Sequence, residues 1–137
     1  MAIESTSVDG SISDVRDLFE RQKAYFATDA TKSYEWRIDQ LDRLLRMLRE
    51  NEQRFFAAVK SDFKTALQEY VFEVAASIGS IEAIKAQLKD WMKPVVAPIP
   101  KFLADSGHKG IVYREPYGVT LIMCPFNGPL TLSLRPA

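Results

Sequence analysis

Apolar residues recur every three or four positions through the first two thirds of the chain, and this spacing predicts amphipathic helices over residues 11–93. One helix is expected to begin after Ser33, because serine caps helix N-termini well. Its apolar positions repeat with heptad spacing, and the opposite face is charged. These apolar positions are Ile38, Leu41, Leu45 and Leu48.

A longer helix is expected to open at Thr65 and to end before Pro94, because proline lacks a donor and disfavours helix at the preceding residue. One face of this helix is apolar and predicts a second wall of the same core. The residues of this face are Val71, Val74, Ile78, Ile81 and Leu88.

The pattern changes after the long helix. Residues 94–100 hold three prolines, which predicts extended chain, and Ile111–Arg114 reads as a short β-strand. The continuous apolar run Val119–Met123 predicts a strand buried on both faces, followed by a helix with Pro129 in its first turn. One such strand cannot bury both faces alone, so the pattern indicates the N-terminal part of a larger α/β protein.

Charge and composition narrow the function. The chain has 18 basic and 18 acidic residues, and this balance argues against nucleic acid or an anionic membrane as a partner. No apolar run reaches the roughly 18 residues that a membrane helix needs. Residues 1–10 are small and polar, which predicts a flexible lead-in rather than a signal peptide. A single cysteine excludes an internal disulfide and suggests the cytoplasm.

Few residues carry candidate chemistry. From spacing alone, Asn127 is first read as the N-cap of the helix that Pro129 begins. Cys124 follows the apolar run and is expected to be an inert core residue. His108 is expected to lie in a solvated turn, and one cysteine with one histidine cannot make a zinc site.

Three segments near the C-terminus resemble the aldehyde dehydrogenase superfamily, and more closely its class 3 branch. Residues 114–119 read Arg-Glu-Pro-Tyr-Gly-Val, residues 125–127 read Pro-Phe-Asn, and residues 129–130 read Pro-Leu. They are similar to the family's Glu-Pro-x-Gly-Val strand entry and its Pro-Trp-Asn turn. The helical half resembles the family as well, so the resemblance covers nearly the whole chain from Asp14.

This resemblance implies a fold: N-terminal helices plus the first strands of a Rossmann-like cofactor domain, incomplete in this chain. The implied parts are a lead-in at 1–10, helices of the cofactor-binding domain at 11–93, an extended connector with an oligomerisation-type strand at 94–113, and the first core strand, the oxyanion turn and the start of the next helix at 114–137. A homodimer is implied for the full-length protein.

The resemblance also implies an activity: oxidation of a medium-chain or aromatic aldehyde to a carboxylic acid, with NAD or NADP. Asn127 matches the asparagine that donates to the developing oxyanion. The backbone that borders the nicotinamide corresponds to Met123, Cys124, Pro125 and Phe126. The nucleophilic cysteine and the glutamate base lie downstream in the family, so this chain alone is expected to be inactive, as one part of a longer enzyme.

Two departures from the family pattern affect the turn. Phe126 replaces the usual tryptophan, and Gly128 stands where class 3 members commonly carry an aromatic residue, which is expected to widen the aldehyde entrance. Two other functions stay open at this point. The chain could be a truncated, non-catalytic family member, or an unrelated helical interaction module built on the heptad seam.

Overall fold

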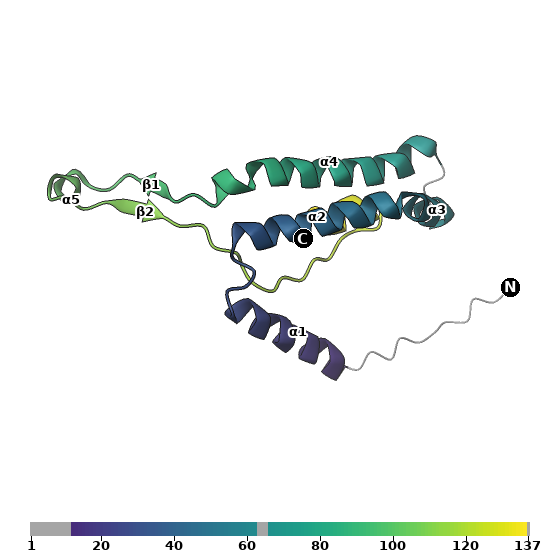
Figure 1. Ribbon diagram of the computed structural model, residues 1–137, viewed down its shortest axis with the longest axis horizontal. Helices are drawn as coiled ribbons and strands as arrows, with labels where there is room; N and C mark the ends of the chain where they lie inside the picture. Colours follow the sequence, from purple (N-terminus) through teal and green to yellow (C-terminus); the bar gives the residue numbers. More distant parts are fainter. Residues whose placement is uncertain (1–11, 63–65, 137) are drawn as a thin grey trace.

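The computed structural model describes residues 12–62 and 66–136 as a helical body from which a narrow arm projects (Figure 1). The predicted lead-in at 1–10 lies outside the described residues. The elements in chain order are α1 (Ile12–Ala27), α2 (Tyr34–Glu50), α3 (Glu52–Asp62), α4 (Leu67–Trp91), β1 (Val95–Ala97), α5 (Lys101–Asp105), β2 (Gly110–Val112) and α6 (Pro129–Leu134).

The ends of the two main helices follow from local chemistry. α2 begins after Ser33, whose Oγ accepts a hydrogen bond from the backbone N–H of Trp36 at 3.1 Å, so the predicted cap is confirmed. α4 begins at Leu67, directly after Ala66, which makes no side-chain cap bond. Thr65, the predicted start, lies outside the described residues. α4 ends at Trp91, ahead of Pro94 as predicted.

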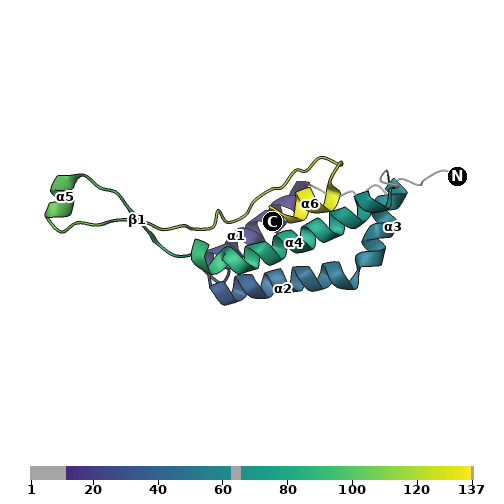
Figure 2. The same ribbon diagram turned by 90° about the horizontal axis from the view of Figure 1, so that it is seen from above.

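α2 and α4 lie side by side and form the core of the body (Figures 1 and 2). Leu45, Leu48 and Ile81 are almost fully buried between them, which confirms both predicted apolar faces. Each such side chain contributes about 1.5–3 kcal/mol by leaving water. At the surface, ion pairs from Arg49 to Glu82 and from Lys85 to Asp42 join the same two helices.

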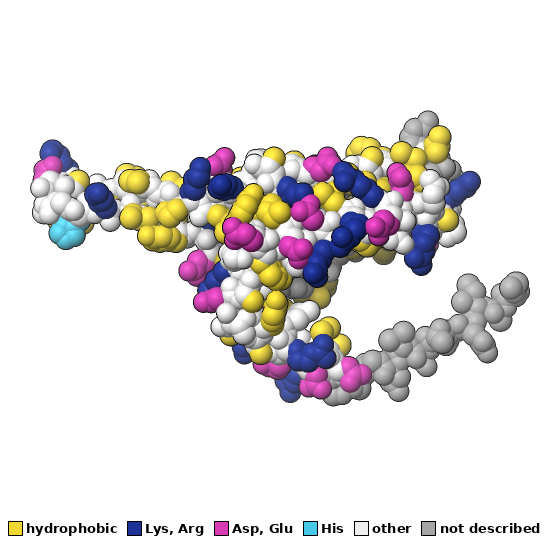
Figure 3. Space-filling model, in the orientation of Figure 1, with side chains coloured by type: hydrophobic (Ala, Val, Ile, Leu, Met, Phe, Trp, Pro, Cys, Tyr) yellow, Lys and Arg dark blue, Asp and Glu magenta, His cyan; other side chains and the backbone are white. Residues whose placement is uncertain are grey.

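The arm is a β-hairpin with a helical tip. β1 and β2 pair in antiparallel fashion, with Val96 opposite Ile111, and α5 connects them. The strands agree with the predicted extended connector, whereas α5 was not expected. Figure 3 shows hydrophobic side chains along the arm and His108 exposed at its tip, as predicted.

The predicted buried strand at Val119–Met123 is not formed. This segment is extended but belongs to no sheet, and Leu121 and Met123 are 83% and 86% exposed. A strand needs a neighbour to satisfy its backbone groups and cover its faces. Within residues 12–62 and 66–136 the only sheet is the two-stranded one of the arm, so this segment has no such neighbour.

The last helix, α6, packs on α4 (Figure 2). It has Pro129 in its first turn, as predicted. Its Leu134 reaches the core cluster around Leu48. The turn before α6 therefore lies next to the core of the body.

Candidate functional site

The candidate site is the turn that leads into α6. Asn127 lies in this turn and is exposed, and its side-chain amide has no hydrogen-bond partner among the described residues. Gly128, not Asn127, occupies the N-cap position, and no side chain caps the helix there. The prediction that Asn127 caps the helix is therefore wrong, because the helix starts one residue too late for its side chain to serve. The amide is free to face a ligand.

A buried carboxylate on α4, that of Glu73, accepts hydrogen bonds from the residues that follow this turn. Glu73 is 3% exposed, and its Oε2 accepts hydrogen bonds from the backbone N–H groups of Leu130 and Thr131 at 3.2 and 3.1 Å. The Thr131 hydroxyl donates to the same oxygen at 3.0 Å. A negative charge at a helix N-terminus is favourable, and bonds to an ionised acceptor are stronger than neutral ones.

Gly128 is buried in this arrangement. A Cβ on Gly128 would lie 3.1 Å from the Leu132 side chain and 3.4 Å from Glu73 Oε1. The expectation that this glycine widens an aldehyde entrance does not agree with its position. The residue faces the packed interior between α4 and α6, so its small size serves close approach of the turn to Glu73.

The four residues matched to the cofactor-side turn precede Asn127 in extended chain. Met123, Cys124, Pro125 and Phe126 are all exposed. The expectation of a buried Cys124 is wrong, because the strand that would have covered it is unpaired here. Within the described part of the chain, residues 119–127 make no backbone hydrogen bonds to other segments. Their N–H and C=O groups are therefore available to a bound molecule.

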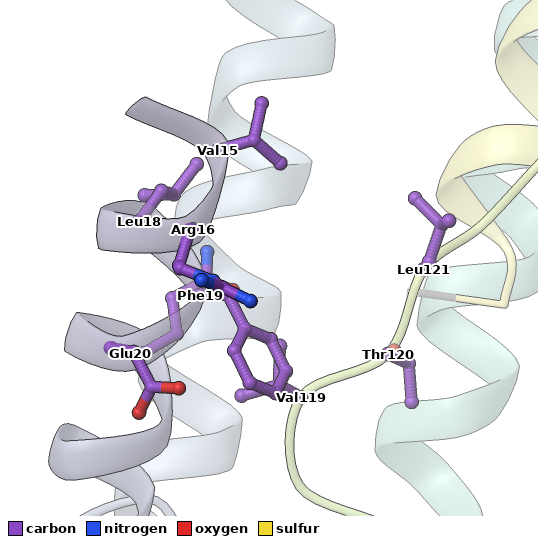
Figure 4. A pocket seen from close by; sticks show the side chains of 9 residues that line it. Val15, Arg16, Leu18, Phe19, Glu20, Val119, Thr120 and Leu121 are labelled. Atoms are coloured by element: carbon purple, nitrogen blue, oxygen red, sulfur yellow. The ribbon is translucent and has the colours of Figure 1, made fainter. Parts of the chain in front are cut away.

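An apolar cleft of about 770 Å³ runs beside this segment. Val15, Leu18 and Phe19 of α1 line one wall, and Val119 and Leu121 line the other. Figure 4 shows the Phe19 ring directed toward Val119 across the cleft. The surface next to the candidate site is thus hydrophobic, and an exposed apolar surface of this kind is typical of a site that packs against another part of a protein.

Among residues 12–62 and 66–136, no three side chains of the metal-ligating types come together. None of the described helices is long and apolar enough to cross a bilayer.

Comparison with known proteins decides the family. The model of the Aldehyde dehydrogenase family matches residues 5–137. The chain belongs to the aldehyde dehydrogenase family. It is 36% identical to human aldehyde dehydrogenase family 3 member B1, over 88% of this chain and 25% of that protein. It is 31% identical to the 4,4'-diaponeurosporen-aldehyde dehydrogenase of Staphylococcus aureus, over 89% of this chain and 26% of the relative.

A solved aldehyde dehydrogenase structure has the same fold in this region. The substrate-bound state of the Staphylococcus aureus enzyme AldH matches 89% of this chain and 26% of its own with a TM-score of 0.81, at 31% identity. The helices with their small two-stranded sheet are thus an α/β fragment of the aldehyde dehydrogenase fold, and the class 3 resemblance is confirmed by the family 3 relatives. An unrelated helical module is excluded. The chain spans about a quarter of the length of these relatives.

The contact of Glu73 with the candidate site was not predicted from the sequence. A signal was present, because Glu73 is the only Asp, Glu, Lys or Arg between residues 70 and 81. It stands beside Val74 and one turn before Ser77, both of which are also buried. A charge within an apolar stretch of helix is costly unless it is paired, so it indicates a dedicated partner. The position of that partner, some 57 residues away in α6, could not be read from spacing.

Proposed function

We propose that the protein carrying this chain oxidises an aldehyde to a carboxylic acid with NAD or NADP, as part of a longer aldehyde dehydrogenase. The single observation that carries the proposal is the exposed Asn127 amide, which lies without a partner in a turn fixed to the body. It stands in a chain of the aldehyde dehydrogenase family. We propose medium-chain or aromatic aldehydes as substrates.

In this proposal Asn127 donates a hydrogen bond to the aldehyde oxygen. A thiolate supplied from outside these residues adds to the carbonyl carbon, and the C=O electron pair moves to oxygen. A neutral donor fixed beforehand stabilises that charge without reorganising when it forms. The amide is suited to this role, since no other side chain competes for it in the described chain.

Met123, Cys124, Pro125 and Phe126 are proposed to border the nicotinamide cofactor. Their exposed backbone groups and extended form fit a ligand that lies along the chain. The cofactor, when bound, would supply the hydride acceptor. One hydride would leave the substrate carbon, and an oxygen atom from water would enter the acid product. Cys124 lies three residues before Asn127 in this backbone stretch and is not proposed as the nucleophile.

The arm is proposed to contact a second copy in a homodimer. Val96, Phe102 and Tyr113 are each more than 65% exposed, which is unusual for large apolar residues. β1 and β2 pair only with each other, so each strand keeps an open edge for another strand. We also propose a cytoplasmic location, although one relative from Arabidopsis thaliana is named as chloroplastic.

The experiment that tests this function is a rate measurement on the protein as its native source makes it. Purified protein is given hexanal or benzaldehyde with NAD or NADP, and the increase in reduced cofactor is followed by its absorbance. We expect aldehyde-dependent reduction that stops when the aldehyde is replaced by its carboxylic acid. Absence of reduction with every aldehyde and both cofactors would overturn the proposal. A parallel sample of the 137-residue chain alone is expected to be inactive.

A further inference from the structure

The carboxylate of Glu73 is the one buried acidic side chain of the described residues, and it spans two elements far apart in the sequence. It projects from α4 and holds the first turn of α6, three to four residues after Asn127. We propose that Glu73 is a positioning residue for the oxyanion donor Asn127. This inference rests on the proposed function, because it assigns Glu73 a task within that reaction.

The hydrogen bonds define where the turn stands. Three donors from Leu130 and Thr131 converge on one oxygen of Glu73 at 3.0–3.2 Å. Three bonds to one atom fix both the height and the rotation of the first turn of α6 relative to α4. Because α6 is only 6 residues long, its own hydrogen bonds give it little rigidity.

Packing transmits this position to Asn127. The buried Gly128 follows Asn127 directly, and a Cβ on it would make tight contacts with Leu132 and Glu73 Oε1. Residues 119–127 have no backbone bonds of their own to other described segments. The orientation of the Asn127 amide is therefore set from its C-terminal side, at the Glu73 contact.

α4 itself is well anchored at this point. The Ser77 hydroxyl donates to the Glu73 carbonyl at 2.7 Å, and Val74 next to it is fully buried. Glu73 thus joins the turn to a buried part of α4. Glutamine in place of Glu73 keeps one carbonyl oxygen for these donors but lacks the charge of a carboxylate, and hydrogen bonds to a neutral acceptor are weaker.

The test is a double-mutant cycle in the enzyme as its native source makes it. The variants are Glu73→Gln, Asn127→Ala and the two together, and kcat and KM for hexanal are measured for each. We expect Glu73→Gln to lower kcat by about tenfold with an unchanged KM, since a misplacement of about 1 Å can cost about 100-fold. In the Asn127→Ala background the same change should alter kcat by less than about twofold, because residues acting through one another are not additive.

The matched control is Glu82→Gln. Glu82 lies on the same helix, but its half-exposed carboxylate pairs with Arg49 of α2, so kcat should not change. Thr131→Val covers the case in which Glu73→Gln does not fold. It removes one donor and should lower kcat in the same direction by a smaller factor.

The outcomes separate two failures. Equal effects of Glu73→Gln in both backgrounds, or none in either, would overturn the positioning role while the proposed function stands. If Asn127→Ala leaves kcat unchanged, the oxyanion assignment fails and the role of Glu73 fails with it. A loss seen only as less folded protein, with normal kcat per folded molecule, would likewise overturn the inference.

Discussion

The ring of Phe26, at the end of α1, occupies the space into which a side chain on Gly118 would project. A Cβ on Gly118 would lie 3.3 Å from two carbons of that ring, and Gly118 has a φ of +91°. The contact joins α1 to the segment that leads toward the candidate site. Glycine is required there for two separate reasons, a left-handed backbone and a close neighbour.

Gly118→Ala is expected to lower the free energy of unfolding by more than backbone strain alone, which is about 1–2 kcal/mol. The matched control is Gly107→Ala, because Gly107 has a similar φ of +86° but an open space around it. Urea denaturation of both variants measures the difference. Phe26→Ala should remove the excess cost of Gly118→Ala, and equal costs for the two alanine variants at the start would contradict this account.

The 137-residue chain alone is expected to self-associate as its concentration rises. Leu121, Met123 and Phe126 are each more than 80% exposed in a segment with an open backbone, which favours pairing between copies. Leu121→Lys should suppress the oligomers that self-association forms. Thr120→Lys adds the same charge beside it and removes no apolar surface, so it should suppress the oligomers less. Sedimentation velocity checks this. Wild-type chain without oligomers, or equal suppression by the two variants, would be evidence against it.

The end of α4 carries a pH-dependent contact. A hydrogen bond from the Lys93 ammonium, at 2.6 Å, and its charge hold the pKa of Asp90 below its ordinary value. The folded pKa is lower than the unfolded one, so ionised Asp90 stabilises the fold above the ordinary value of about 3.9. This contribution disappears as the pH falls through the folded pKa.

Lys93→Gln should therefore raise the pKa of Asp90 toward its ordinary value. Lys89→Gln, the control, should raise it less, because Lys89 acts only through its charge and is the smallest influence. Carboxyl carbon chemical shifts followed by NMR between roughly pH 2 and 6 report the titration. A larger rise in the Lys89 variant would show that the assignment of the cause is wrong.

Local chemistry in the sequence was enough to predict the helical body. The heptad positions from Ile38 to Leu48 and the face from Val74 to Leu88 face each other because each helix must cover an apolar stripe. Ser33 and Pro129 mark helix starts through fixed backbone preferences. These features depend only on neighbours within a few residues.

The misses share a different physical origin. Val119–Met123 has the composition of a buried strand, but whether a strand forms depends on a partner that the described residues do not include. The cap expected at Asn127 moved to Gly128, because Glu73 and not a local side chain satisfies the first turn of α6. Contacts between residues as distant as 73 and 131 are set by tertiary packing and leave no regular spacing.

The most direct test of the central claim is the kcat of Asn127→Ala in the enzyme as its native source makes it. Removal of one oxyanion donor is expected to lower kcat by about 100- to 1,000-fold, with the KM for the aldehyde nearly unchanged, because the bond strengthens only as charge develops. Arg135→Gln, an exposed position at the end of α6 that has no proposed role in the site, is the companion variant for general damage to this part of the chain, and it should leave kcat unchanged. For Asn127→Ala, a kcat within about twofold of wild type, or a loss confined to KM, would contradict the account.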